Sequence, residues 1–263
     1  MTSGLVVPAT LTAPAKLTWS LRVVGTRPDG LHLIEAEMVT LDLVDSIDLS
    51  IGSGVVYRGE HVPDLDPEAS ADLVSRALAI VGADVRAVVT KRIPAGAGLG
   101  GGSADAAAIL RWGGVRDLGT AVSLGADVAF CLEGGRARVE GIGERIIPLE
   151  HVDRTVTLLT PPIHCSTPAV YRRWDELGGP SNAAGNGPAV NGLAVNDLES
   201  AALSVSPELG IWRDRLREAS GQEPRLAGSG STWFVEGSFP GAGRVVARTT
   251  GRQGDYLPRA RRW

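Results

Sequence analysis

The sequence contains little cysteine: Cys131 and Cys165 are the only two among its 263 residues. Their spacing matches neither a zinc site nor a disulfide framework. A chain of this length buries most of the surface that it exposes when unfolded, so its core needs no disulfide or metal. We therefore interpret both cysteines as reduced thiols of a cytoplasmic protein, with one bridge between them as the open alternative.

The sequence also lacks a long basic block and a long apolar run. Its net charge is −4, and its one dense basic cluster, Arg259, Arg261 and Arg262, is interpreted as a solvated tail. We expect no nucleic-acid partner. No apolar run approaches the roughly 18 residues of a membrane helix, and no basic region precedes the apolar N-terminal stretch. We expect no membrane association, and a monomer or a homodimer.

The hydrophobic pattern changes its period several times along the chain. Alternating, β-rich segments predict strands, and apolar residues at helical spacing predict helices. Strands are expected at residues 17–24, 31–41, 45–51, 84–93, 136–142, 145–148, 156–160 and 232–236. Helices are expected at residues 67–82, 103–112, 117–124 and 207–219, and a loop at 178–192. Because strands and helices do not alternate strictly, the pattern favours an α+β fold over a doubly wound parallel sheet.

Residues 94–103, PAGAGLGGGS, contain five glycines within seven positions. Glycine reaches positive φ at little cost and lets the backbone approach a ligand closely. Such a loop can direct several N–H groups at one anion. Ser103 suits the N-cap of an alanine-rich helix, whose N-terminus adds partial positive charge at the same place. Strand, glycine loop and helix together predict a phosphate-binding site.

Three other interpretations of this loop are weaker. A flexible glycine linker would not end at an alanine-rich helix start. A Walker A loop requires a lysine before its Ser or Thr, and Gly102-Ser103-Ala104 has none. Gly96, Gly98 and Gly101 match the spacing of a dinucleotide fingerprint, but no clear acidic residue follows about 20 positions later. The loop is therefore interpreted as a binding site for phosphate groups.

The loop resembles that of the GHMP kinases, which has the form Pro-x-x-x-Gly-Leu-Gly followed by Ser and small residues. Five further segments resemble motifs of one branch of that family, in the same order. They are APAKL at 13–17, RPDGLH at 27–32, LGADV at 124–128, NDLE at 196–199 and AGSGS at 227–231. Members of that branch phosphorylate a cytidine diphosphate-linked polyol on the non-mevalonate route to isoprenoid precursors.

The resemblance implies a two-domain GHMP kinase fold with the active site in the cleft between the domains. The N-terminal domain would be ribosomal protein S5 domain 2-like and the C-terminal domain ferredoxin-like. We place them at residues 1–152 and 153–263. The resemblance also implies ATP and Mg²⁺, and a cytidine diphosphate-linked polyol as the substrate.

The resemblance further implies a catalytic pair, Lys16 and Asp127. Phosphoryl transfer needs positioning and charge stabilisation more than covalent chemistry. Asp127 would orient or deprotonate the acceptor hydroxyl, and Lys16 would stabilise charge on the transferring group. From the residues alone, Asp127 could equally cap a helix and Lys16 could be a surface lysine. No protein metal ligands are expected.

The remaining candidate residues surround the two ligands. Those expected at the nucleotide are Pro94, Gly96, Gly98, Leu99, Gly100, Gly101, Gly102, Ser103, Ala104, Asp72 and Lys91. Those expected at the substrate are Leu31, His32, Thr167 and Tyr171. His32 would bind the edge of the cytosine and Tyr171 would stack on it. Without the resemblance, His32 is an ordinary strand histidine and Tyr171 a core tyrosine.

Four positions depart from the pattern of that branch. Leu31 replaces a tyrosine of the cytosine pocket and loses aromatic stacking worth roughly 0.5–1.5 kcal/mol. Thr18, Ala104 and Ala129 replace asparagine, serine and proline. These changes bear on the substrate more than on catalysis. A GHMP kinase for a different alcohol, a non-catalytic nucleotide-binding relative and a β-rich module without nucleotide stay as alternatives.

Overall fold

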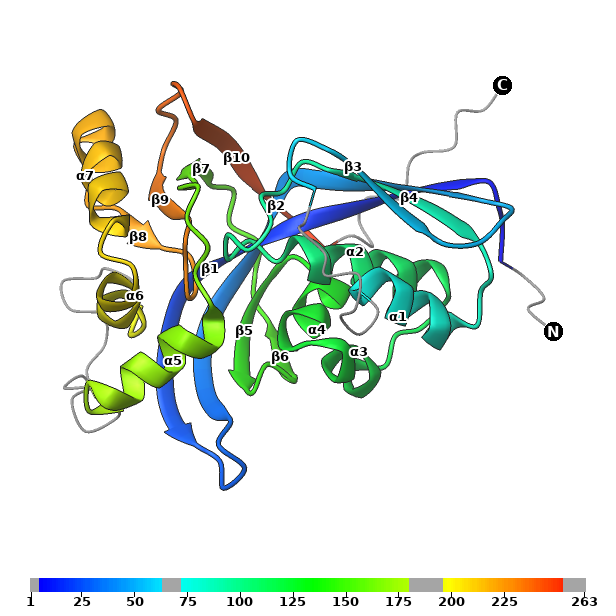
Figure 1. The fold of residues 1–263 in the computed structure, drawn as a ribbon, viewed down its shortest axis with the longest axis horizontal. Helices are drawn as coiled ribbons and strands as arrows, with labels where there is room; N and C mark the ends of the chain where they lie inside the picture. Colours follow the sequence, from blue (N-terminus) through cyan, green and yellow to red (C-terminus); the bar gives the residue numbers. More distant parts are fainter. Residues whose placement is uncertain (1–4, 63–71, 180–195, 253–263) are drawn as a thin grey trace.

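The computed structural model describes residues 5–62, 72–179 and 196–252. These residues form ten strands and seven helices (Figure 1). The strands are β1 (Ala9–Thr26), β2 (His32–Ser50), β3 (Val55–Gly59), β4 (Arg86–Lys91), β5 (Arg136–Gly141), β6 (Arg145–Pro148), β7 (Thr155–Leu159), β8 (Arg225–Leu226), β9 (Trp233–Glu236) and β10 (Arg244–Thr250). The helices are α1 (Leu73–Val81), α2 (Gly101–Trp112), α3 (Leu118–Leu124), α4 (Ala126–Glu133), α5 (Thr167–Glu176), α6 (Glu199–Val205) and α7 (Leu209–Ser220).

Strands β1 and β2 form a long antiparallel hairpin that runs through the middle of the molecule (Figure 1). Its turn is closed by backbone bonds from the N–H of Arg27 to Leu31 and from the N–H of Gly30 to Arg27. The separate strands predicted at 31–41 and 45–51 are wrong, because β2 is continuous through both. Its polar residue Asp45 does not interrupt the strand, since the buried carboxylate is paired with a lysine of β4.

The strands join into one sheet in the order β3-β4-β2-β10-β7-β9-β8, with β1 and β5 also paired to β2. Strand β10 lies in the middle of this order and joins the two halves of the sheet. Its residue Thr249 pairs with Leu41 of β2, and its residue Val246 pairs with Thr157 of β7. Helices α1 to α4 lie together beside the β1–β2 hairpin, and α5 to α7 lie at the other end (Figure 1). The domain limits 1–152 and 153–263 stay a prediction.

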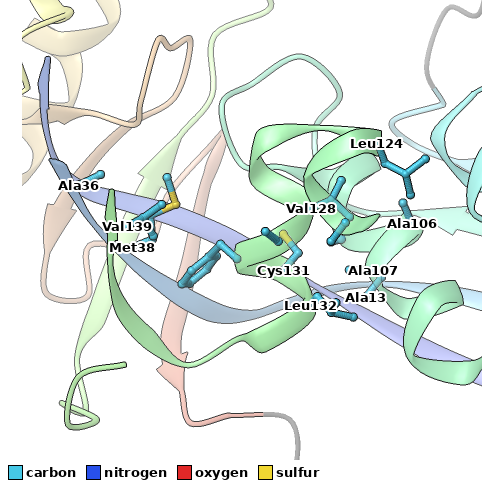
Figure 2. Packing of buried hydrophobic residues seen from close by; sticks show 14 of the residues in the cluster. Ala13, Ala36, Met38, Ala106, Ala107, Leu124, Val128, Cys131, Leu132 and Val139 are labelled. Atoms are coloured by element: carbon cyan, nitrogen blue, oxygen red, sulfur yellow. The ribbon is translucent and has the colours of Figure 1, made fainter. Parts of the chain in front are cut away.

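Helix α2 lies at the centre of the packing around the hairpin. Its residues from Ala104 to Leu110 are all buried, so small alanine side chains let α4 and β1 approach closely. Figure 2 shows Val128 and Cys131 of α4 in this core together with Ala107 of α2. Both cysteines of the chain are buried and free, and burial raises the pKa of the Cys131 thiol to about 12. This thiol therefore stays protonated at neutral pH.

Several elements were missed by the hydrophobic pattern because they are short or interrupted by polar residues. These are β3, α4, α5, α6, β8 and β10. The helix predicted over 67–82 is observed from Leu73, with Asp72 as its N-cap. The loop predicted at 178–192 lies almost entirely outside the described residues. Within the part of the chain that the structure describes, no helix is long and apolar enough to cross a membrane.

Candidate active site

The glycine loop connects β4 to α2 and packs against two other segments of the chain. A β-carbon at Gly98 would lie 2.4 Å from the carbonyl oxygen of Ala227, and one at Gly100 would lie 2.7 Å from Cγ of Lys16. Both glycines also have positive φ, 77° and 67°. Glycine is required at both positions for two reasons: a β-carbon would clash with these atoms, and any other residue would strain the backbone at positive φ. The loop is therefore built for close approach of backbone to its surroundings.

The prediction that Ser103 caps the following helix is wrong. Helix α2 begins at Gly101, and Gly100 is its N-cap in the left-handed conformation. The first intrahelical bond runs from the N–H of Ala104 to the carbonyl of Gly100. The N–H groups of Gly101, Gly102 and Ser103 precede it and have no partner within the helix. Three consecutive amides and the positive end of the helix dipole thus face one place, which suits an anion.

Lys16 and Asp127 meet beside this loop. Lys16 Nζ lies 3.1 Å from Asp127 Oδ2 and 3.1 Å from the hydroxyl oxygen of Thr18. The backbone N–H of Lys16 donates to the carbonyl of Leu99, which fixes β1 to the loop. Thr18, which replaces an asparagine, therefore still gives Lys16 a hydrogen-bond acceptor. Lys16 is 4% exposed, whereas the Asp127 side chain is 35% exposed.

Asp127 lies in the first turn of α4, whose N-cap is Gly125, so Asp127 does not cap this helix. A carboxylate at a helix N-terminus is favoured by the helix dipole. A β-carbon at Gly143 of the β5–β6 turn would lie only 3.0 Å from Ala126, so this turn approaches the start of the helix closely. The helix thus starts at a fixed place and holds the carboxylate opposite Lys16.

Two cavities open on either side of this pair. One has a volume of about 760 Å³ and contains Lys16 and His32 in its wall, and the other has about 590 Å³ and contains the glycine loop. The residues common to both walls are Gly98, Ser103, Asp127, Thr167 and Pro168. The two cavities therefore adjoin where the first turn of α2 faces Asp127. Two ligands bound in them would meet at this place.

Asp72 lies in the wall of the loop-side cavity as the cap of α1. Its carboxylate accepts hydrogen bonds from the hydroxyl of Tyr57 at 2.5 Å and from the N–H groups of Val74 and Ser75 at 2.9 and 3.1 Å. Burial opposes its ionisation, but these bonds outweigh burial and hold the pKa of Asp72 below its ordinary value. Asp72 is thus an anchored carboxylate with few free lone pairs.

Lys91 lies under the loop in a buried triad. Its Nζ contacts a carboxylate oxygen of Asp45 and lies 2.6 Å from Oδ2 of Asp105, and all three residues are nearly inaccessible. Asp45 also accepts the backbone N–H groups of Arg92 and Ile93, which hold the start of the loop. One ammonium therefore balances two carboxylates. Neither aspartate was predicted as a site residue from the sequence, although an aspartate inside an apolar helix, as Asp105 is, indicates a buried partner.

The other Asp105 oxygen, Oδ1, is buried without a hydrogen-bond partner among the described residues. Burial raises the pKa of Asp105 to about 7, while the charge of Lys91 opposes the shift and that of Asp45 adds to it. A proton on Asp105 near neutral pH would relieve the excess negative charge of the triad.

The predicted substrate residues gather at the far end of the larger cavity. The ring of His32 lies 4.7 Å from that of Tyr171 and 5.7 Å from that of Trp174. Its Nε2 lies 2.8 Å from Oδ1 of Asp175. Leu31 lies beside it at the tip of the hairpin and is 47% exposed. His32, Tyr171 and Leu31 were predicted from the sequence. Trp174 and Asp175 were not, because only the fold of helix α5 brings them close to His32.

Two of the sequence motifs, NDLE at 196–199 and AGSGS at 227–231, hold the backbone beside the site in place. The Asn196 amide nitrogen donates to the carbonyls of Leu226 and Gly228 at 2.9 and 2.7 Å. Asp197 accepts the N–H of Val23 at 2.9 Å. The Asn196 bonds fix the turn after β8, and the N–H of Thr232, which follows this turn, donates to the carbonyl of Ala97 in the glycine loop. Thr167 lies at the same place, with its hydroxyl 2.8 Å from that of Ser229.

Comparisons with known proteins agree with this geometry. The family model for the GHMP kinases N terminal domain matches residues 68–135. The chain is 36% identical over 247 residues to the 4-diphosphocytidyl-2-C-methyl-D-erythritol kinase of Paracoccus denitrificans, over 89% of this chain and 88% of that protein. The enzyme of the same name from Cereibacter sphaeroides is 34% identical over 266 residues, 92% of this chain and 94% of that protein. The chain belongs to the 4-diphosphocytidyl-2-C-methyl-D-erythritol kinases of the GHMP family.

Solved structures give the same result. A crystal structure of 4-(cytidine 5'-diphospho)-2C-methyl-D-erythritol kinase superposes with a TM-score of 0.71 at 29% identity, over 92% of this chain and 100% of that one. A mevalonate kinase superposes with a TM-score of 0.57 at 10% identity, which shows a shared fold. The α+β GHMP kinase fold expected from the motifs is thereby confirmed. A β-rich module without nucleotide is not compatible with membership of this kinase family.

Proposed function

We propose that this protein transfers the γ-phosphoryl group of ATP to the 2-hydroxyl of 4-diphosphocytidyl-2-C-methyl-D-erythritol. The observation that carries this proposal is the meeting of two cavities at Ser103 and Asp127, with the Lys16 ammonium beside them. One cavity contains a loop suited to phosphates, and the other contains an aromatic and imidazole corner suited to a nucleobase. The names of the relatives described above support the same substrate.

The phosphates of ATP would lie against the N–H groups at the start of α2. The acceptor hydroxyl would lie between them and Asp127. Its oxygen attacks the γ-phosphorus, the bond from that phosphorus to the bridging oxygen breaks, and ADP leaves. Asp127 orients the hydroxyl and takes its proton, and Lys16 stabilises the charge on the transferring group.

We also propose that Mg²⁺ accompanies the nucleotide. Among the described residues, no three His, Cys, Asp or Glu side chains form a metal cluster. This arrangement fits Mg²⁺, which is commonly held by substrate phosphates, water and one or two protein oxygens. The Ser103 hydroxyl, at the border of both cavities, is the protein oxygen that would reach the ion. The ion would neutralise charge on the phosphates.

The cytidine end of the substrate would occupy the corner formed by His32, Tyr171 and Leu31. Leu31 offers an apolar surface where a tyrosine would stack. The direct test is ATP consumption with the cytidyl substrate, with the same polyol lacking its cytidine group as the comparison. The proposal predicts turnover that depends on the cytidine group. Equal turnover of both compounds would favour a GHMP kinase for a different alcohol.

A further inference from the structure

We propose that Asp175 is a positioning residue that determines which nucleobase this kinase accepts. It acts by fixing the proton of His32 on one ring nitrogen. This inference rests on the proposed function, because it concerns the base of the substrate in the larger cavity. It adds a residue from the far end of α5, about 143 positions from His32 in the chain.

Helix α5 surrounds His32 with three side chains. Tyr171 and Asp175 are four residues apart and therefore lie on one face of the helix. The Tyr171 ring lies over that of His32 at an interplanar angle of 33°, and Trp174 meets it edge-on at 83°. The two aromatic rings and the Asp175 carboxylate together fix the plane and the rotation of the imidazole. The His32 side chain is 13% exposed and lines the cavity.

The contact with Asp175 selects one tautomer of His32. An ionised carboxylate has no proton and can only accept a hydrogen bond. The His32 Nε2 that lies 2.8 Å from it must therefore carry a hydrogen. In the neutral ring the other nitrogen, Nδ1, is then an acceptor. Nδ1 makes no hydrogen bond to another described residue, so it is available to a ligand.

An acceptor at this place distinguishes the two pyrimidines. Cytosine carries an amino group at C4, which donates, whereas the corresponding group of uracil-type bases is a carbonyl, which accepts. Nδ1 can accept a hydrogen bond from the amino group of cytosine. It cannot bind the carbonyl of a uracil-type base, because both groups are acceptors. The structure thus assigns to Asp175 the preference for a cytidine over a uridine diphosphate compound. A substitution of Asp175 that lets His32 carry its hydrogen on either ring nitrogen should weaken this preference.

The decisive variant is Asp175→Asn, because an amide can either donate to Nε2 or accept from it. The matched control is Glu176→Gln, which removes the neighbouring charge on the same helix, where Glu176 pairs with Arg173 instead. Asp175→Glu keeps an acceptor-only group and serves as the rescue. The first measurement is the tautomer of His32 in the free protein by ¹⁵N NMR. The chain has only four histidines, so the resonances can be assigned by substitution.

We expect wild type and Glu176→Gln to show hydrogen on Nε2, and Asp175→Asn to show a mixture. In turnover assays, Asp175→Asn should lower kcat/KM for the cytidyl substrate about tenfold, mainly through KM, and reduce its advantage over the uridyl analogue similarly. Asp175→Glu should recover part of that loss. Hydrogen on Nδ1 in the wild type, or an unchanged base preference in Asp175→Asn, would overturn the proposal. If the wild type turned over neither compound, the proposed function would fail, while the NMR result would still decide the role of Asp175.

Discussion

Lys16 and Lys91 are the only lysines of the chain, and both lie buried against the same glycine loop. A β-carbon at Gly100 would touch Lys16, and one at Gly101 would lie 3.2 Å from the Lys91 ammonium. Their partners differ. Lys91 is enclosed with two buried carboxylates, whereas Lys16 faces one partly exposed carboxylate at the junction of two cavities. We therefore assign Lys91 to stability and Lys16 to chemistry.

Replacing each lysine by methionine separates these roles. Lys91→Met leaves two buried carboxylates without a counter-ion and should lower the free energy of unfolding by about 3–5 kcal/mol. Lys16→Met leaves a carboxylate that water reaches, so its stability loss should be smaller, about 1 kcal/mol. Its turnover should nevertheless fall at least ~10²-fold. Urea unfolding and a coupled ATPase assay measure both effects, and equal stability losses would contradict the assignment.

The glycine loop allows a steric test with an internal control. Gly98→Ala and Gly114→Ala introduce the same methyl group at residues with φ of 77° and 76°. The new methyl group at Gly98 would clash with the carbonyl of Ala227. At Gly114 nothing lies within 4 Å of a β-carbon. Both variants should lose about 1–2 kcal/mol to backbone strain. Gly98→Ala alone should also lose the stabilisation by Mg-ATP, about 2.7 kcal/mol at 100 times Kd in the wild type.

The buried triad predicts a pH dependence of stability. The pKa of Asp105 is raised from 3.8 to about 7, chiefly by burial. Between these values the folded state binds more protons than the unfolded state, so this group makes stability fall as pH rises from about 4 to about 7. Above pH 7 its contribution should be constant. Asp105→Asn should remove this slope from urea unfolding measured across the range, and an unchanged slope would exclude Asp105 as its source.

The exposed leucine of the nucleobase corner predicts a gain of function. Leu31→Tyr restores an aromatic ring beside His32 and should lower KM for the cytidyl substrate by about two- to tenfold, equivalent to roughly 0.5–1.5 kcal/mol of stacking. Ile51→Tyr, at an exposed position at the opposite end of β2, is the control and should have no effect. An unchanged KM in Leu31→Tyr would show that the base does not reach the hairpin tip.

The elements that are specified by contiguous residues could be predicted from the sequence. The strand, loop and helix at residues 84–112 followed from period changes and glycines, apart from two-residue errors at both ends of the strand and at the helix start. The error at the helix start arose because glycine is a poor helix former, yet Gly101 and Gly102 enter the helix under the constraint of packing. Contacts such as His32 with Asp175 join distant segments, and no local pattern announces them. Asp45 was missed for the same reason, whereas the position of Asp105 inside an apolar helix was itself a local signal of a buried partner.

The Asp127→Asn variant tests the central claim most directly, because asparagine keeps the shape of the side chain and an oxygen that can accept from Lys16. The variant should bind Mg-ATP as the wild type does, shown by the same increase in melting temperature. Its single-turnover rate with the cytidyl substrate should fall at least ~10²-fold, because the hydroxyl loses its base. A rate equal to that of the wild type would contradict the account.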